Sequence, residues 1–303
     1  MSLLKPQSAL ALKGTPIEEW TDVHFFRPVG IRIARALEPT GVSADQVTLW
    51  GLLVGLVAGH LVVYASLWLN LAGVALFVVS DLFDSADGQL ARLRGTSTRL
   101  GRVLDGLSDM TRFLNLYVHL LVRMVHGQGW SWPAVVLVFV VIWSHSFQGA
   151  TVDFIKNVYL EVGAGKGGET DLPEDLQPNG QAGVLARVAR RLYRAYSRRQ
   201  ATMFPITYKM LQSARRSGLD RALAERYAGR QAALLPVLTL IATNIRFALL
   251  AAAILAGHVW WFLFVTAVPM NLVMAAVILV HERNTADLVR EIAGHTQVPV
   301  GAD

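Results

Sequence analysis

Four aspartates in the first half of the chain are spaced so that their carboxylates can meet. Asp84 and Asp87 are three residues apart, which places both on one face of a helix. Asp105 and Asp109 are four residues apart and share a face in the same way. Residues 95–100 predict a short turn, which brings the two helix ends together. Four uncompensated negative charges at a membrane edge repel strongly, and a bound divalent cation removes that cost.

The residue types in this cluster restrict the metal. The chain has no cysteine, so a thiolate zinc site is excluded. Ligands that are all oxygen favour Mg²⁺, Mn²⁺ or Ca²⁺, and a phosphate-bearing substrate favours Mg²⁺ or Mn²⁺. Two cations beside a diphosphate would stabilise the leaving phosphate, and a carboxylate near an acceptor hydroxyl would take its proton. The cluster therefore predicts metal-assisted transfer of a phosphate-linked group.

Small residues separate the two aspartate pairs. Gly88 and Ala91 leave one helix face bare, and Gly101 opens the next helix. Bare backbone lets a flat base and a diphosphate approach closely, although small residues in membrane helices also serve as packing contacts. Arg92, one turn beyond Asp87, either neutralises the acidic cluster or holds a phosphate. We interpret Gly88, Ala91 and Gly101 as a surface that a base and a diphosphate can approach, and both roles stay open for Arg92.

Other polar residues lie within apolar segments and form a candidate acceptor pocket. Arg112 follows Asp109 by three residues and shares its face. Polar side chains at membrane depth are functional candidates, but hydrogen bonds between helices explain them equally well. The residues that we assign to this pocket are Arg112, Asn115, His145 and Gln148.

The composition is that of a membrane protein. Hydrophobic residues make up 53% of the 303 and charged residues 17%, and the mean hydropathy is +0.40. A span needs about 20 mostly apolar residues. Six stretches qualify, so we predict an all-α polytopic protein with six transmembrane helices near residues 47–67, 69–94, 101–125, 132–156, 232–256 and 259–280.

The basic residues set the orientation. The net charge is +6, and most Lys and Arg lie outside the spans on the side that carries the aspartates. By the positive-inside rule that side is cytoplasmic, together with both termini. In so apolar a chain, basic loops beside anionic lipid explain the charge, and we expect no nucleic-acid partner.

Two regions flank the spans. Residues 20–37 predict an amphipathic helix in the interface, after which Ser43 caps the next helix with Gln46 three residues on. Residues 157–180 are predicted to form a loop. Residues 184–196 predict a basic helix, with Arg198 and Arg199 directly after it, that faces solvent or lipid phosphate; donor binding is the alternative. The predicted units are an N-terminal segment (1–45), four spans with the motif (46–156), a basic cytoplasmic insertion (157–230), two spans (231–281) and a cytoplasmic tail (282–303).

The motif resembles the signature of the CDP-alcohol phosphotransferases, also called CDP-alcohol phosphatidyltransferases. The pattern D-x2-D-G-x2-A-R-x8-G-x3-D-x3-D is matched at every fixed position from Asp84 to Asp109. Members often have Pro-Asn-x-x-Thr before the first span, where this chain has Ala44-Asp45-Gln46-Val47-Thr48. We therefore assign no donor contact to Asp45.

The resemblance implies roles for the motif residues. Asp84, Asp87 and Asp105 would bind a two-metal centre that holds the diphosphate of a CDP-linked donor. Asp109 would complete the second metal site and act as general base. Gly88, Ala91 and Gly101 would shape the pocket for the donor's cytidine, and Arg92 would support it.

The resemblance also implies the reaction and its setting. A phosphatidyl or head-group unit would pass to an acceptor hydroxyl with release of CMP, in phospholipid biosynthesis. One of the two substrates would be a lipid, and the enzyme a homodimer in a bacterial or archaeal cytoplasmic membrane. Two alternatives stay open at this stage: an intramembrane prenyltransferase that uses a metal-bound diphosphate, and a transporter with an acidic ion site.

Overall fold

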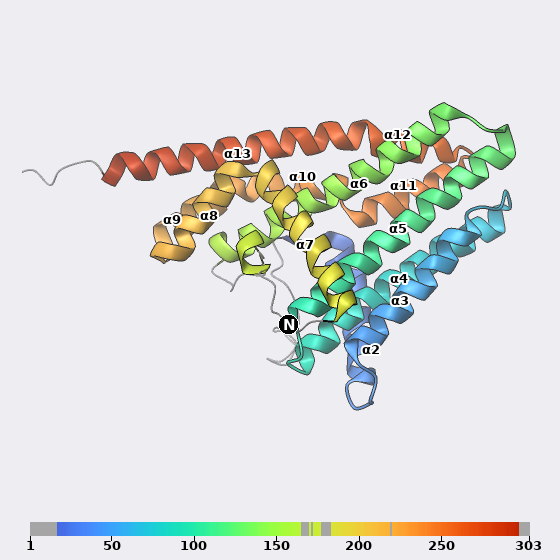
Figure 1. Cartoon of the computed structure of the whole chain (residues 1–303), viewed down its shortest axis with the longest axis horizontal. Helices are drawn as coiled ribbons and strands as arrows, with labels where there is room; N and C mark the ends of the chain where they lie inside the picture. The colour runs from blue at the N-terminus through green and yellow to red at the C-terminus, as the bar shows by residue number, and fades with distance from the viewer. Residues whose placement is uncertain (1–16, 165–169, 171, 177–182, 219, 297–303) are drawn as a thin grey trace, which may run out of the picture.

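A computed structural model describes residues 17–164, 170, 172–176, 183–218 and 220–296 (Figure 1). Every regular element in these residues is a helix, which confirms the all-α prediction. Five helical segments are long and apolar enough to cross a membrane. These are Ala44–Leu61, Leu67–Leu93, Trp132–Gly163, Arg221–Leu255 and Val259–Ala293.

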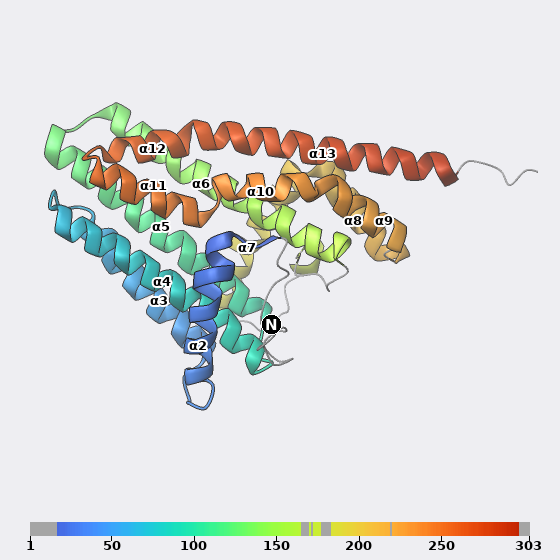
Figure 2. The same ribbon diagram turned by 180° about the vertical axis from the view of Figure 1, so that it is seen from behind.

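The third predicted span is a helix of the right length but of more polar composition. Helix α5 (Arg99–Gln128) has 30 residues and is not among the five apolar segments. It packs against α3 (Ala44–Leu61) and α6 (Trp132–Val158). Figures 1 and 2 show the α3–α4 and α5–α6 connections at the same end of the bundle. The count of six crossings stays a prediction.

Helix α3 and helix α4 (Leu67–Leu93) pack closely because glycines line their contact. Gly51, Gly55 and Gly59 recur every fourth residue on α3, and all three are buried. A Cβ atom added at Gly55 would lie 2.5 Å from Cδ of Arg112, and one at Gly59 would overlap the Asn115 amide. The glycine stripe therefore makes room for the polar side chains of α5.

The N-termini of these helices are capped as their sequences predict. Ser43 accepts a hydrogen bond from Gln46 N, and the Gln46 side chain accepts one from Ser43 N at 2.8 Å, which confirms the expected capping box. Thr98 caps α5 by accepting a hydrogen bond from Gly101 N at 3.0 Å. Both caps lie at the end of the bundle that carries the aspartates.

The N-terminal segment packs across α4. A π-helical turn (Asp22–Phe26) leads into α2 (Arg27–Leu37), which contacts α4 along its length. Gly30 lies against Ser85 of α4 so closely that a Cβ atom would be 2.7 Å from its hydroxyl. The predicted helix is confirmed, and its place in the membrane interface stays a prediction.

Arg94 fixes the connection between α2 and α3. Its guanidinium donates to the carbonyl of Val42 at 2.5 Å and to that of Leu37 at 2.6 Å. It also donates to the carbonyls of Glu38 and Thr40, both at 2.9 Å. One side chain at the end of α4 thus satisfies the carbonyls left free where α2 ends.

The basic insertion is mostly helical. Beyond α6, the chain makes a π-helical turn (Tyr159–Gly163) and a 3₁₀ turn (Pro173–Leu176). The predicted loop 157–180 falls partly outside the described residues. Three helices follow: α7 (Val184–Met203), α8 (Pro205–Ser217) and α9 (Arg221–Gln231).

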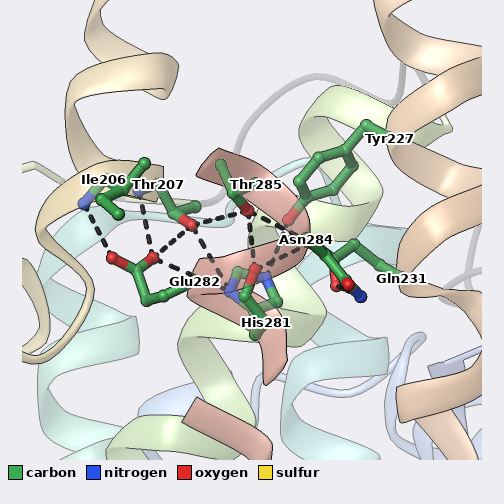
Figure 3. Close-up of polar contacts among 8 residues, drawn as sticks. All are labelled: Ile206, Thr207, Tyr227, Gln231, His281, Glu282, Asn284 and Thr285. Carbon is green, nitrogen blue, oxygen red and sulfur yellow. Dashed lines mark hydrogen bonds and ion pairs between the residues drawn. The ribbon is translucent and has the colours of Figure 1, made fainter. Parts of the chain in front are cut away.

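A buried polar network fastens α8 and α9 to the last helix, α13 (Pro269–Thr296). The carboxylate of Glu282 accepts hydrogen bonds from the backbone of Ile206 at 2.7 Å and Thr207 at 3.1 Å, which caps the first turn of α8 (Figure 3). His281 is fully buried between Thr207 at 3.3 Å and Tyr227 of α9 at 3.1 Å. Both imidazole nitrogens therefore have partners, and the cluster is structural.

The fifth predicted span, residues 232–256, is not one continuous helix. Pro236 lacks a donor and Ala242 is extended, with ψ of 176°. The chain therefore breaks into a 3₁₀ turn (Ala232–Leu234), α10 (Leu235–Leu238), a second 3₁₀ turn (Thr239–Ile241) and α11 (Thr243–Leu255).

The break supplies a partner for a buried charge. Arg246 is 1% exposed, and it donates to the Ile241 carbonyl at 2.7 Å. It also donates to Oε1 of Gln148 on α6 at 2.6 Å. Neutral carbonyl oxygens thus solvate this guanidinium inside the bundle.

The last predicted span is kinked and longer than expected. Helix α12 (Val259–Ala267) ends before Pro269, where α13 begins. α13 continues to Thr296, through much of the segment that the sequence assigns to a tail. Figures 1 and 2 show its C-terminal part extending away from the bundle beside α8 and α9.

The glycine stripe leads to a stability prediction. Gly55→Ala should lower the thermal unfolding temperature of the purified protein, because its methyl group overlaps Arg112. We expect a loss of roughly 1–3 kcal/mol, as for other overpacked sites. The control is Gly149→Ala on α6, where no heavy atom lies within 4 Å of the added Cβ. Equal unfolding temperatures for the two variants would contradict this packing.

Candidate metal and substrate site

Three motif aspartates converge where α4 meets α5. One carboxylate oxygen from each of Asp84, Asp87 and Asp105 lies within 4.8 Å of the other two. Asp87 is buried, and the other two are half-buried. The short connection from Leu93 to Arg99 turns the chain back, so that α5 begins beside the end of α4.

Asp109 lies beside this group and is held by an arginine. Nη2 of Arg112 donates to the carboxylate of Asp109 and lies 3.4 Å from Oδ1 of Asp84. Nη1 of the same residue lies 3.0 Å from Oδ1 of Asp81. The Asp109 side chain is 45% exposed and that of Arg112 only 4%. The guanidinium therefore pairs with carboxylates of α4 and α5 from the buried side of the cluster, while part of the Asp109 side chain faces solvent.

Two hydroxyl groups fix the orientation of the charged side chains. Thr48 of α3 donates to Oδ2 of Asp87 at 2.5 Å. Ser80 accepts a hydrogen bond from Nη1 of Arg112 at 2.5 Å and donates to the carbonyl of Gly51 at 2.7 Å. The three helices α3, α4 and α5 thus share one polar network beneath the carboxylates.

The predicted donor-binding residues flank the aspartates. A Cβ atom at Gly88 would lie 3.3 Å from Nη1 of Arg92, so this guanidinium lies over the glycine face. Gly101 opens α5, and the nearest carboxylate to its added Cβ is that of Asp45, at 3.9 Å. Ala91 lies between them on α4 and is half-buried. Asp45, to which we assigned no donor contact because the pattern around it departs from the family's, thus lies at the edge of this surface.

The predicted acceptor residues do not form one group. Only Arg112 contacts the aspartates among the described interactions. Asn115 donates to the Leu56 carbonyl at 2.9 Å beside the glycine stripe, and Nδ1 of His145 pairs with the Tyr117 hydroxyl at 2.7 Å. Gln148 contacts Arg246 and donates to the Thr266 carbonyl and Oδ1 of Asn271. These contacts match the interhelical hydrogen bonds that were the alternative for these residues.

The donor set fits a divalent cation. Oδ1 of Asp105 is buried and has no hydrogen-bond partner among the described residues. A buried carboxylate oxygen without a partner is costly unless a cation or a donor meets it. Three carboxylates with only oxygen to offer are suited to Mg²⁺ or Mn²⁺. The site residues therefore match the chemistry that the spacing predicts.

Sequence reasoning missed Thr48, Ser80 and the glycine stripe. Thr48 was detectable, because it keeps the threonine of the Pro-Asn-x-x-Thr pattern at the end of Ala44–Thr48. The stripe was detectable as glycine at every fourth position from 51 to 59. Ser80 carries no comparable signal, since its role depends on where Arg112 lies.

Part of the chain is similar to a known protein family. Residues 42–171 match the family model for CDP-alcohol phosphatidyltransferase, a range that contains Thr48 and the whole motif from Asp84 to Asp109. This match, which covers less than half of the chain, supports the family that the motif suggests. The five apolar helices and the match to a family of membrane enzymes support an integral membrane protein.

One characterised relative adds a narrower likeness. A phosphatidylinositol phosphate synthase from Mycobacteroides abscessus is 38% identical over 77 residues. The alignment covers 25% of this chain and 34% of that protein, so the chain spans about a third of the relative's length.

The role of Thr48 can be tested through metal binding alone. Thr48→Val keeps the side-chain volume but removes the hydrogen bond to Asp87, so we expect Mn²⁺ affinity to fall about tenfold or more, as for other residues that orient metal ligands. Titration of the purified protein followed by electron paramagnetic resonance measures it. Thr111→Val is the control, because its hydroxyl bonds only to the Leu107 carbonyl. Unchanged Mn²⁺ binding in Thr48→Val would refute the assignment.

Proposed function

We propose that this protein is a CDP-alcohol phosphatidyltransferase, which transfers a phospho-alcohol unit from a CDP-linked donor to an acceptor hydroxyl and releases CMP. The convergence of Asp84, Asp87 and Asp105 carries the proposal, because this arrangement suits a metal-bound diphosphate. The family match over residues 42–171 supports it. The reaction would belong to phospholipid biosynthesis.

The three converging aspartates would hold a two-metal centre with Asp109. Bound Mg²⁺ or Mn²⁺ would supply positive charge that stabilises the diphosphate as it separates. Thr48 holds Asp87 in its orientation, and Arg112 limits the repulsion between Asp84 and Asp109. These contacts set the carboxylates in place before a substrate binds.

Asp109 is proposed as the general base. It is the most exposed of the carboxylates that Arg112 contacts, so an acceptor hydroxyl can reach it. As the acceptor oxygen forms its bond to the transferred phosphorus, Asp109 takes the hydroxyl proton. The bond from that phosphorus to the oxygen of CMP breaks, and CMP leaves with the electron pair. Gly88, Ala91, Arg92 and Gly101 would bind the cytidine half.

The donor and the acceptor follow from the names of the similar proteins. A phosphatidyltransferase moves a phosphatidyl unit, which places the lipid on the donor, as in CDP-diacylglycerol. The synthase from Mycobacteroides abscessus makes phosphatidylinositol phosphate by its name, so a phosphorylated inositol is the acceptor that we propose. Of the predicted acceptor residues, Arg112 has the position that best supports contact near the reacting groups. Asn115, His145 and Gln148 are assigned to supporting the helices around it.

The active site is proposed to face the cytoplasm of a bacterial or archaeal cell. The Lys and Arg excess outside the spans, in the chain's N-terminal segment and in residues 157–230, supports this orientation. The homodimer implied by the family resemblance stays a prediction.

The division of roles among the aspartates tests the proposal. Asp84→Asn should abolish CMP release from CDP-diacylglycerol and weaken donor binding, because a ligand is lost. Asp109→Asn should keep donor binding measured by calorimetry with Mn²⁺ but lose most transfer, because an amide cannot accept the proton. Asp287→Asn, distant on α13, is the control and should match the wild type.

Acceptor identity is read in the same assay. Inositol phosphate, inositol and glycerol phosphate are supplied separately, and the radiolabelled lipid product is identified. No CMP release with any acceptor would refute the reaction class. Equal loss of donor binding in Asp84→Asn and Asp109→Asn would make Asp109 mainly a metal ligand.

A further inference from the structure

Helix α7 carries an uncompensated basic face. Arg187, Arg191 and Arg198 are exposed and lie within a narrow arc of the helix because of their spacing. No acidic residue occurs in the sequence between Asp175 and Asp220. None of the three arginines forms an ion pair within the described part of the chain. Their positive charges therefore face outward together.

The same helix exposes apolar side chains next to this basic face. Val188 is 46% exposed and Leu192 is 51% exposed, one turn apart on α7. Two large apolar side chains beside three arginines would be unfavourable in water alone. This combination is typical of a helix that lies in a membrane interface, with apolar residues in the acyl region and arginines at the phosphates.

Contacts with α6 place α7 at the correct depth for such an interface. Arg199 of α7 donates to Oγ of Ser146 at 2.9 Å, and Tyr196 donates to Oδ2 of Asp153 at 2.6 Å. At ~1.5 Å per residue along α6, Ser146 lies roughly 21 Å and Asp153 roughly 31 Å from Trp132. The hydrocarbon core is about 30 Å thick. α7 therefore crosses α6 near the edge of the hydrocarbon region.

The side of α6 that α7 covers continues a lipid-facing surface. Val136, Phe139 and Trp143 are 58%, 61% and 62% exposed on α6. One turn beyond Trp143, the ring of Phe147 is covered by the guanidinium of Arg199 at 4.7 Å. The exposed apolar residues of α6 end at the point where α7 crosses it. We therefore place α7 at the boundary between acyl chains and head groups.

A pocket at the C-terminal end of the basic face has room for a phosphate group. It has a volume of 670 Å³, and its wall includes Arg194, Arg198 and Lys209. Glu174 also lines it, but this carboxylate already accepts hydrogen bonds from Tyr208 and Gln212. The cations therefore outnumber the acid.

We propose that α7 is a membrane-surface helix that binds the phosphate groups of anionic phospholipids. Val188 and Leu192 enter the acyl region, and Arg187, Arg191 and Arg198 bind the head-group phosphates, with the pocket as one seat. This inference does not depend on the transfer reaction. Since α7 packs on α5, which carries Asp105 and Asp109, the anionic lipid is held beside the aspartate cluster.

The depth of α7 is measurable because the chain contains no cysteine. Leu192→Cys is labelled with an environment-sensitive fluorophore in the full-length protein, reconstituted in nanodiscs that contain doxyl-labelled lipid. We expect strong quenching at Leu192→Cys. Ala222→Cys, exposed on α9, is the control and should stay unquenched. Absence of quenching at Leu192→Cys, or equal quenching at both sites, overturns the proposal.

Head-group preference is measured with the same label. Quenching by brominated phosphatidylglycerol is compared with quenching by brominated phosphatidylcholine, and we expect a preference of about fivefold or more for the anionic lipid. A triple variant with Arg187→Gln, Arg191→Gln and Arg198→Gln should bring the ratio of quenching by the two lipids close to one. The control removes three exposed charges elsewhere, by Arg216→Gln, Arg221→Gln and Arg290→Gln, and should keep the preference.

Free phosphate distinguishes the two sources of the ligand. Inorganic phosphate and glycerol phosphate are added to the nanodiscs at millimolar concentration. If α7 binds lipid, the preference persists, because the phosphates are held at the surface by their acyl chains. If soluble phosphate abolishes the preference, or if the ratio is already one in the wild type, the lipid assignment is wrong.

Discussion

The guanidinium of Arg112 holds together the two helices that bear the acidic residues. It contacts Asp81 and Asp84 on α4 and Asp109 on its own helix, and it is almost fully buried. A charge removed from water in this way is stable only if its partners surround it. Gly55 permits this arrangement, because any side chain there would occupy the space of the arginine. The close contact of α3, α4 and α5 and the grouping of carboxylates thus depend on one another.

The same contact explains how an acidic cluster persists at the edge of an apolar bundle. Arg112 neutralises part of the charge from the buried side, and Thr48 and Ser80 fix the side chains by hydrogen bonds. Oδ1 of Asp105 is buried and meets no hydrogen-bond donor among the residues that the structure describes. A site of this kind is preorganised for a cation, since its ligands are already in place. The exposed side of Asp109 faces solvent.

The half of the molecule that carries the aspartates could be predicted largely from its sequence, because helical spacing places Asp84 beside Asp87 and the short turn brings Asp105 to them. The capping box at Ser43 was equally local. What the sequence did not reveal depends on contacts between distant segments. Arg246 is buried between the Ile241 carbonyl, which the helix break supplies, and the side-chain oxygen of Gln148 on α6. The partners of His145 and Gln148 are likewise set by helix packing. Helix α8 of the basic insertion is capped by Glu282 of α13, a contact between residues 75 or more positions apart.

We propose that the aspartates form the metal centre on which the donor diphosphate is bound. A structure of the protein with Mn²⁺ and CDP, determined by crystallography with anomalous scattering, measures this directly. We expect anomalous peaks for Mn²⁺ between Asp84, Asp87 and Asp105. The phosphates of CDP should coordinate these ions, and its cytosine should lie near Gly88 and Gly101. Mn²⁺ elsewhere in the chain, or CDP bound away from these carboxylates, would contradict it.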